Sequence, residues 1–92
     1  LTLSNLAVLE EKRGRHAEAL AAAERAVAVR RAKLGAGHAD LANDLLTQAQ
    51  ALSGLGRKRE AAAPLEAIVA MKGVDEALTA DARALLDQLK RR

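Results

Sequence analysis

The chain contains no cysteine and no Phe, Trp or Tyr, and Pro64 is its single proline. Without cysteine, neither a disulfide nor a thiolate metal site can form. Without Phe, Trp or Tyr, no such ring is available for stacking on nucleic-acid bases. No apolar run approaches the roughly 20 residues that span a bilayer, and no signal peptide is visible. We therefore expect no membrane segment and a cytoplasmic setting.

Alanine and leucine supply most of the apolar surface, and half of the 92 residues are hydrophobic. Both residues head the helix propensity ranking, whereas the β-branched and aromatic residues of strands are scarce. Small alanines let helix axes approach closely, so tight helix hairpins are expected. This length allows one domain. Because Leu1 already lies in an apolar-periodic segment, we expect the domain to be part of a longer chain.

Apolar residues recur at helical spacing in five segments, which are separated by glycines. The predicted helices cover residues 1–12, 16–34, 41–55, 58–72 and 75–92. Asp40 is expected to cap the third helix, and Asp75 or Thr79 the fifth. Pro64 predicts a late start or a kink in the fourth helix, because proline removes one helical hydrogen bond.

The sequence repeats itself with a period of 42 residues. Gly14-Arg15 returns as Gly56-Arg57, and residues 81–88 resemble residues 41–48 as a third, partial copy. Repeats of this length are typical of helical solenoids, in which neighbouring hairpins cover one another's apolar faces. We predict one domain with repeat one at 1–35, a linker at 36–40, repeat two at 41–73 and a capping helix at 75–92.

At these residues the chain resembles the tetratricopeptide repeat family, in particular the longer-linker repeats of kinesin light chain. Asn5-Leu6-Ala7 is similar to the Asn-Leu-Ala of the family's first helix, and residues 14–19 resemble its Gly-Arg turn. Departures include Gln48, which stands where the family has a buried leucine, and His16, which replaces an aromatic residue. The resemblance implies an all-α fold, namely a right-handed superhelix of antiparallel helix hairpins (an α-solenoid) with about two and a half repeats and five helices.

The resemblance also implies a concave groove that is lined by the first helix of each repeat and holds an extended peptide or a partner helix. Carried onto this sequence, the groove residues are Asn5, Val8, Lys12, Asn43, Thr47, Gln50, Arg83 and Asp87. Asn5 is favoured because an amide both donates and accepts hydrogen bonds and can bind peptide backbone. The alternative for Asn5 is a hydrogen bond to a neighbouring helix. The predicted function is a protein-protein interaction scaffold with a protein or peptide partner.

His16 and His38 are the candidate catalytic or metal-binding residues. They lack the His-x-x-x-His spacing of metal sites and a linked carboxylate. We expect partial burial for His16 and a loop-shaping hydrogen bond for His38. The glycines lie at helix ends and form no phosphate-binding loop. The sequence therefore predicts no enzyme activity, no catalytic residue, no metal site and no cofactor.

Three other interpretations stay open. The domain could be an autoregulatory helical segment of a larger bacterial signalling protein. The basic clusters 30–31, 57–59 and 90–92 suggest nucleic-acid binding. This function is less favoured, because acidic residues flank two of the clusters and the net charge is only +3. Self-association through an uncovered first helix is the third, since Leu1, Leu3 and Leu9 lack a preceding repeat.

Overall fold

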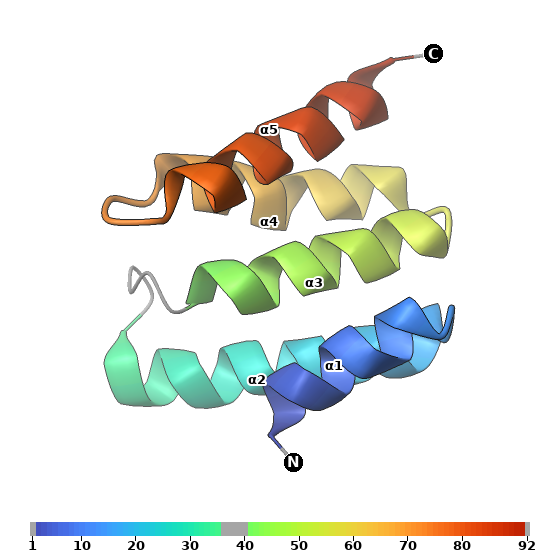
Figure 1. Ribbon diagram of the computed structural model, residues 1–92, viewed down its shortest axis with the longest axis vertical. Coiled ribbons are helices and arrows are strands. Elements are labelled where there is room, and N and C mark those ends of the chain that lie inside the picture. Colours follow the sequence, from blue (N-terminus) through green and yellow to red (C-terminus); the bar gives the residue numbers. More distant parts are fainter. Residues whose placement is uncertain (1, 36–40, 92) are drawn as a thin grey trace.

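Five α-helices follow one another along the part of the chain that the structure, a computed structural model, describes, which is residues 2–35 and 41–91 (Figure 1). The helices are α1 (Leu3–Lys12), α2 (His16–Leu34), α3 (Leu41–Gly54), α4 (Lys58–Ala70) and α5 (Glu76–Lys90). The predicted all-α class with five helices is confirmed. The predicted cap Asp40 and the predicted linker residue His38 lie outside the described residues.

The two turns inside the helix hairpins have the same geometry one period apart. Gly14 has φ 77° and Gly56 has φ 79°, a left-handed conformation that a side chain would strain. Arg15 donates its amide to the Glu10 carbonyl at 2.8 Å, and Arg57 repeats this bond to Leu52 at 2.8 Å. This pattern is the Schellman motif, so the repeated Gly-Arg pair fixes where α1 and α3 end.

Helix starts follow the capping signals. The Thr2 hydroxyl accepts a hydrogen bond from the Asn5 amide at 3.1 Å, which begins α1. The Asp75 carboxylate accepts from the Ala77 amide at 2.8 Å, so Asp75 rather than Thr79 caps α5. Each cap satisfies an amide that the helix itself leaves unpaired.

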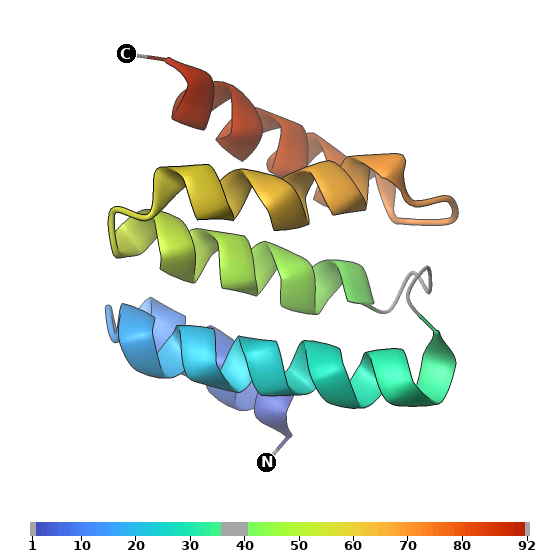
Figure 2. The same ribbon diagram turned by 180° about the vertical axis from the view of Figure 1, so that it is seen from behind.

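The helices form two layers, with α1, α3 and α5 in one and α2 and α4 in the other (Figures 1 and 2). The central helix is α3, which contacts all four other helices. Its apolar stripe Leu41, Leu45 and Leu52 is buried, as the spacing predicts, and packs with Leu65 and Ile68 of α4. Between α1 and α2 the core consists mainly of alanines. The layers therefore meet across a thin interface with no large aromatic anchor.

Pro64 lies inside α4, which begins at Lys58. The predicted late start is therefore wrong. The apolar residues Ala61, Leu65 and Ile68 are all buried on the same side of the helix, before and after the proline. Tertiary packing of this face stabilises α4 although Pro64 lacks the amide N–H for one helical hydrogen bond. Most helices in proteins owe their stability to such packing.

Candidate functional site

A groove lies between α1 and α3 and holds most of the predicted partner-binding residues. We call it the α1–α3 groove, and its volume is about 560 Å³. The predicted residues that line it are Asn5, Val8, Asn43, Thr47 and Gln50. Helical spacing explains why the groove residues of each helix lie on one side, because residues three, four and seven apart share one face of a helix. The fold thus brings together five residues from two repeats.

The other three predicted residues lie elsewhere. Lys12 is exposed near the end of α1 and does not line the groove. Arg83 and Asp87 line a separate hollow of about 330 Å³ beside α5, together with Val69 and Lys90. The structure therefore separates the α5 pair from the residues of the α1–α3 groove.

The amide side chains of the groove are open to solvent. Asn5, Asn43 and Gln50 are exposed, and none of their side-chain amides makes a hydrogen bond within residues 2–35 and 41–91. The alternative in which Asn5 bonds a neighbouring helix is therefore absent from the described part. Three unpaired amides in one groove offer both donors and acceptors to a ligand.

Thr47 differs from these amides because it is only 7% exposed. Its hydroxyl donates to the backbone carbonyl of Asn43 at 3.1 Å, one turn earlier in the same helix. This bond satisfies the hydroxyl locally. Thr47 thus shapes the bottom of the groove more than it presents a polar group.

An ion pair crosses the bottom of the groove between α2 and α3. Arg30 Nε lies 2.7 Å from Asp44 Oδ2, and the Asp44 side chain is 3% exposed. Arg30 also donates to the Ser4 hydroxyl of α1 at 3.3 Å. A buried carboxylate needs such a partner, since an isolated charge is costly to bury.

Sequence reasoning missed Ser4, Arg30, Asp44 and Leu46, which also line the α1–α3 groove. Arg30 was assigned to a basic cluster and Asp44 to no role. One signal was present: Asp44 lies among Leu41, Ala42, Leu45 and Leu46, so an acidic side chain falls within a strongly apolar stretch. Such a residue usually has a specific partner.

His16 is half-buried, as predicted from its place in the repeat. Its Nδ1 lies 2.7 Å from Glu11 Oε1. On its other side the ring faces Gly54 of α3, where an added Cβ would come within 2.5 Å of Nδ1. His16 therefore packs the start of α2 against the end of α3 in the space that the missing side chain leaves.

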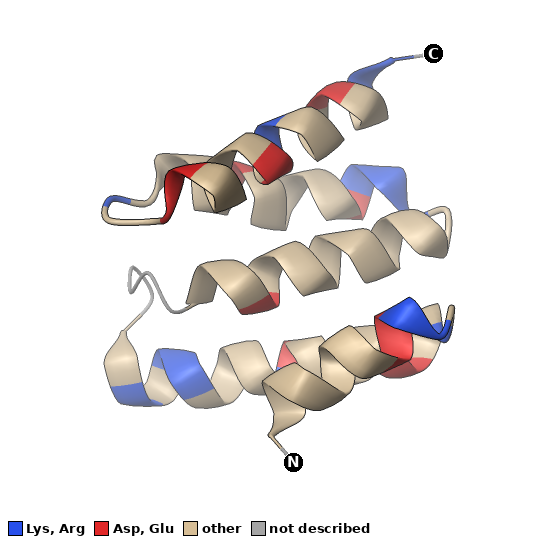
Figure 3. Cartoon of the chain, viewed as in Figure 1, with Lys and Arg blue, Asp and Glu red and all other residues tan. Residues whose placement is uncertain are grey.

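Charged residues of both signs are mixed on α1, α2, α4 and α5, whereas α3 carries little charge (Figure 3). In the cluster 57–59, Arg57 Nε donates to Glu60 Oε2 at 2.6 Å. This hydrogen bond and the attraction of the two charges lower the pKa of Glu60 and raise that of Arg57. Arg30 and Arg57 are thus engaged by acidic side chains, which weakens the case for a continuous phosphate-binding surface.

The described residues contain no group of three or more His, Asp or Glu side chains arranged to hold a metal ion. Among the described helices, none combines the length and hydropathy that crossing a bilayer requires.

Two helix hairpins that repeat the same turn, and a fifth helix packed on the second hairpin, are the arrangement that the repeat predicts. The sequence profile of the tetratricopeptide repeat matches residues 1–72. The chain belongs to the tetratricopeptide repeat family. Repeats of this family generally form non-catalytic scaffolds that mediate protein-protein interactions. No curated protein and no solved structure matches the chain.

Proposed function

We infer that this tetratricopeptide repeat domain binds an extended peptide of a protein partner in the α1–α3 groove. The observation that carries the proposal is the set of three exposed amides, Asn5, Asn43 and Gln50, around one groove. An extended peptide exposes its own N–H and C=O groups, which must find partners when they are buried. Side-chain amides can pair with both kinds of group whatever the peptide sequence is.

The groove favours ligands of low charge. Its ion pair, Arg30 with Asp44, is internally balanced, so it offers no strong field of one sign. Val8 is 41% exposed and Leu46 also lines the groove, so both can contact apolar ligand side chains. Backbone recognition by the amides, with small apolar side chains toward Val8 and Leu46, is the binding mode that these features support.

Lys12 extends the surface at one end. Asn5 and Lys12 are seven residues apart on α1, which is roughly 10 Å along the helix. An extended peptide covers this span with about three or four residues. We therefore expect an acidic residue to be preferred at the end of the peptide that passes Lys12. Arg83 and Asp87 of α5 would contact only a longer ligand.

The test uses peptides selected for binding to the chain from a random library, with affinities measured by fluorescence polarisation. The variant Asn5→Ala, Asn43→Ala, Gln50→Ala should bind at least about tenfold more weakly, because each lost hydrogen bond contributes roughly 0.5–1.5 kcal/mol. Gln88→Ala removes an exposed amide of α5 outside the groove and is the matched control. Equal binding by the triple variant, with an unchanged circular dichroism spectrum, would contradict the proposal and favour the autoregulatory alternative.

A further inference from the structure

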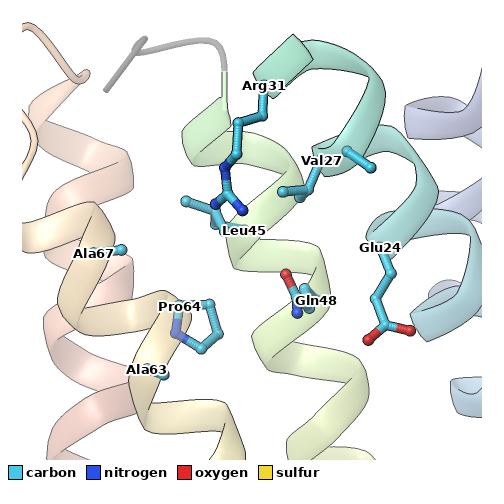
Figure 4. Close-up of a pocket in the computed structure, with 9 residues that line it drawn as sticks. Glu24, Val27, Arg31, Leu45, Gln48, Ala63, Pro64 and Ala67 are labelled. Carbon is cyan, nitrogen blue, oxygen red and sulfur yellow. The ribbon is translucent and has the colours of Figure 1, made fainter. Parts of the chain in front are cut away.

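A second groove lies between α2 and α4 in the other layer, with α3 at its bottom (Figure 4). We call it the α2–α4 groove, and its volume is about 350 Å³. Val27, Leu45 and Pro64 form a buried apolar floor. It shares no lining residue with the α1–α3 groove. A surface on this face is therefore independent of the proposed peptide site.

Gln48 of α3 lies at the bottom of this groove and is half-buried (Figure 4). One period earlier, the same position of the repeat is Leu6, which packs against Ala7, Ala22 and Ala23. The Gln48 amide makes no hydrogen bond within the described part of the chain. A ligand that covers it must supply a polar partner, because a buried unpaired amide is unfavourable.

Two opposite charges border the groove on the same helix. Glu24 and Arg31 both line it from α2, and both are exposed. Neither forms an ion pair with another described residue. The hydrogen bond with Glu60 is the main cause that raises the pKa of Arg57, and the charge of Glu24 has a smaller effect in the same direction, so the Arg57 guanidinium is engaged by Glu60 and not by Glu24. The two charges are seven residues apart, or roughly 10 Å along the helix, with Ala28 between them.

We propose that a second copy of this chain docks on this face, with the two α2 helices packed antiparallel about a two-fold axis between Val27 and Ala28. Such an axis places residue 24 of one copy opposite residue 31 of the other, since an interface with two-fold symmetry repeats each contact. The Glu24 carboxylate accepts hydrogen bonds from the partner's Arg31. Arg31 donates equally to the partner's Glu24. One pair of side chains thus yields two ion pairs.

The chemistry of the groove favours a helix over an extended peptide as the occupant. An extended peptide would leave most of its backbone groups unpaired, because Gln48 is the polar side chain at the bottom of the groove. A helix pairs its own backbone. Ala28, Ala63 and Ala67 line the groove with small side chains, so a second helix can approach closely.

A second copy also satisfies Gln48. The aliphatic part of the partner's Arg31 can cover the apolar floor at Val27 and Leu45, as long charged side chains commonly do. Its guanidinium has five N–H donors, so one can reach the Gln48 carbonyl while others bind Glu24. The helix that fits must carry an acid and a base two turns apart with a small residue between them, and α2 of this chain has that pattern.

The test measures self-association by sedimentation equilibrium from roughly 10 μM to roughly 1 mM protein. The wild-type chain should show a monomer-dimer equilibrium. Glu24→Arg and Arg31→Glu should each weaken it at least about tenfold, because like charges then face one another. The double variant Glu24→Arg, Arg31→Glu should restore it, since the reciprocal pairs form again with their signs exchanged. All positions changed are exposed, and circular dichroism verifies the fold.

Lys33→Glu is the matched control. Lys33 is exposed on the same helix but lines a hollow beside Leu3 of α1, so this change alters the net charge as Arg31→Glu does without touching the proposed interface. Lys33→Glu should change the dissociation constant of the dimer by no more than about twofold. A wild-type chain that stays monomeric to 1 mM, or a double variant that fails to recover, overturns the proposal. Loss of the dimer in Leu9→Ser but not in the charge variants overturns it in favour of the first helix.

Discussion

Arg30 and Asp44 form an ion pair whose two partners differ sharply in burial. Arg30 Nε lies 2.7 Å from Asp44 Oδ2, while the arginine side chain is 37% exposed and the aspartate 3%. The contact is electrostatic, because the buried Oδ2 lacks the geometry of a hydrogen bond despite the short distance. With the bond from Arg30 to Ser4, one arginine connects α1, α2 and α3 below the α1–α3 groove.

This asymmetry predicts unequal effects of removing either partner. Arg30→Ala leaves the buried Asp44 carboxylate without its cation and should lower the free energy of unfolding by roughly 3–5 kcal/mol. Asp44→Ala leaves a guanidinium that water can reach, so we expect a loss of only about 1 kcal/mol. Urea denaturation at pH 7 measures both. The double variant should be no less stable than Arg30→Ala alone, and a larger loss in Asp44→Ala than in Arg30→Ala would contradict the argument.

The same pair shows why the sequence predicts the helices better than the site. The stripe Leu41, Leu45 and Leu52 follows from spacing within one helix, which is a local property. The contact of Arg30 with Asp44 depends on how α2 packs on α3, and no spacing in the sequence encodes it. Likewise, the resemblance to the tetratricopeptide repeat family predicted Thr47 as a groove residue, but its hydroxyl bond to Asn43 required the three-dimensional structure. The late start predicted from Pro64 is wrong because packing outweighs the propensity of one residue.

Gln48→Leu should stabilise the domain. The residue is half-buried above the apolar floor of the α2–α4 groove, and Leu6 stands at the same position of repeat one. Covering this floor with an apolar side chain should raise the free energy of unfolding by about 1 kcal/mol. Gln88→Leu is the matched control, since Gln88 occupies the corresponding place in α5 and is exposed. Thermal denaturation compares them, and equal midpoints for the two variants would contradict the prediction.

The Arg57–Glu60 pair predicts a shift that proton NMR can follow. The hydrogen bond from Arg57, with the attraction of its charge, lowers the pKa of Glu60. A lowered pKa in the folded state adds stability above the unfolded pKa, and that stability is lost as the pH falls through the folded value. The effect therefore belongs to the range below about pH 4. Arg57→Ala should return the pKa of Glu60 toward its ordinary value, whereas Arg59→Ala, which changes the same net charge, should leave it lowered.

Because both residues of this pair are exposed, its contribution to stability should be small at neutral pH. Raising the salt concentration should weaken it further. Unfolding measured at pH 7 should hardly distinguish Glu60→Gln from the wild type. A large loss of stability in that variant would show that Glu60 has a structural role beyond the pair.

The contact between Gly54 and His16 predicts that Gly54→Ala destabilises the wild-type chain but not the His16→Ala variant. Alanine normally stabilises a helix relative to glycine by up to about 1 kcal/mol. Here a Cβ on residue 54 would lie 2.5 Å from His16 Nδ1, so Gly54→Ala requires the ring to move away from the position in which Nδ1 lies 2.7 Å from Glu11 Oε1. We expect a loss of roughly 1–3 kcal/mol from this overpacking. In the His16→Ala background the obstacle is gone, and Gly54→Ala should be neutral or stabilising.

Urea denaturation of the wild type, both single variants and the double variant measures the coupling between the two positions. Ser53→Ala, one residue earlier in α3, is the control for a change near the end of this helix. It should show no coupling to His16→Ala, because His16 faces Gly54. If Gly54→Ala lowers the free energy of unfolding equally with and without the His16 imidazole, the glycine is needed for its backbone conformation and not to make room for the ring. Coupling confined to Gly54 would establish that the histidine in the aromatic position of repeat one depends on a missing side chain in repeat two.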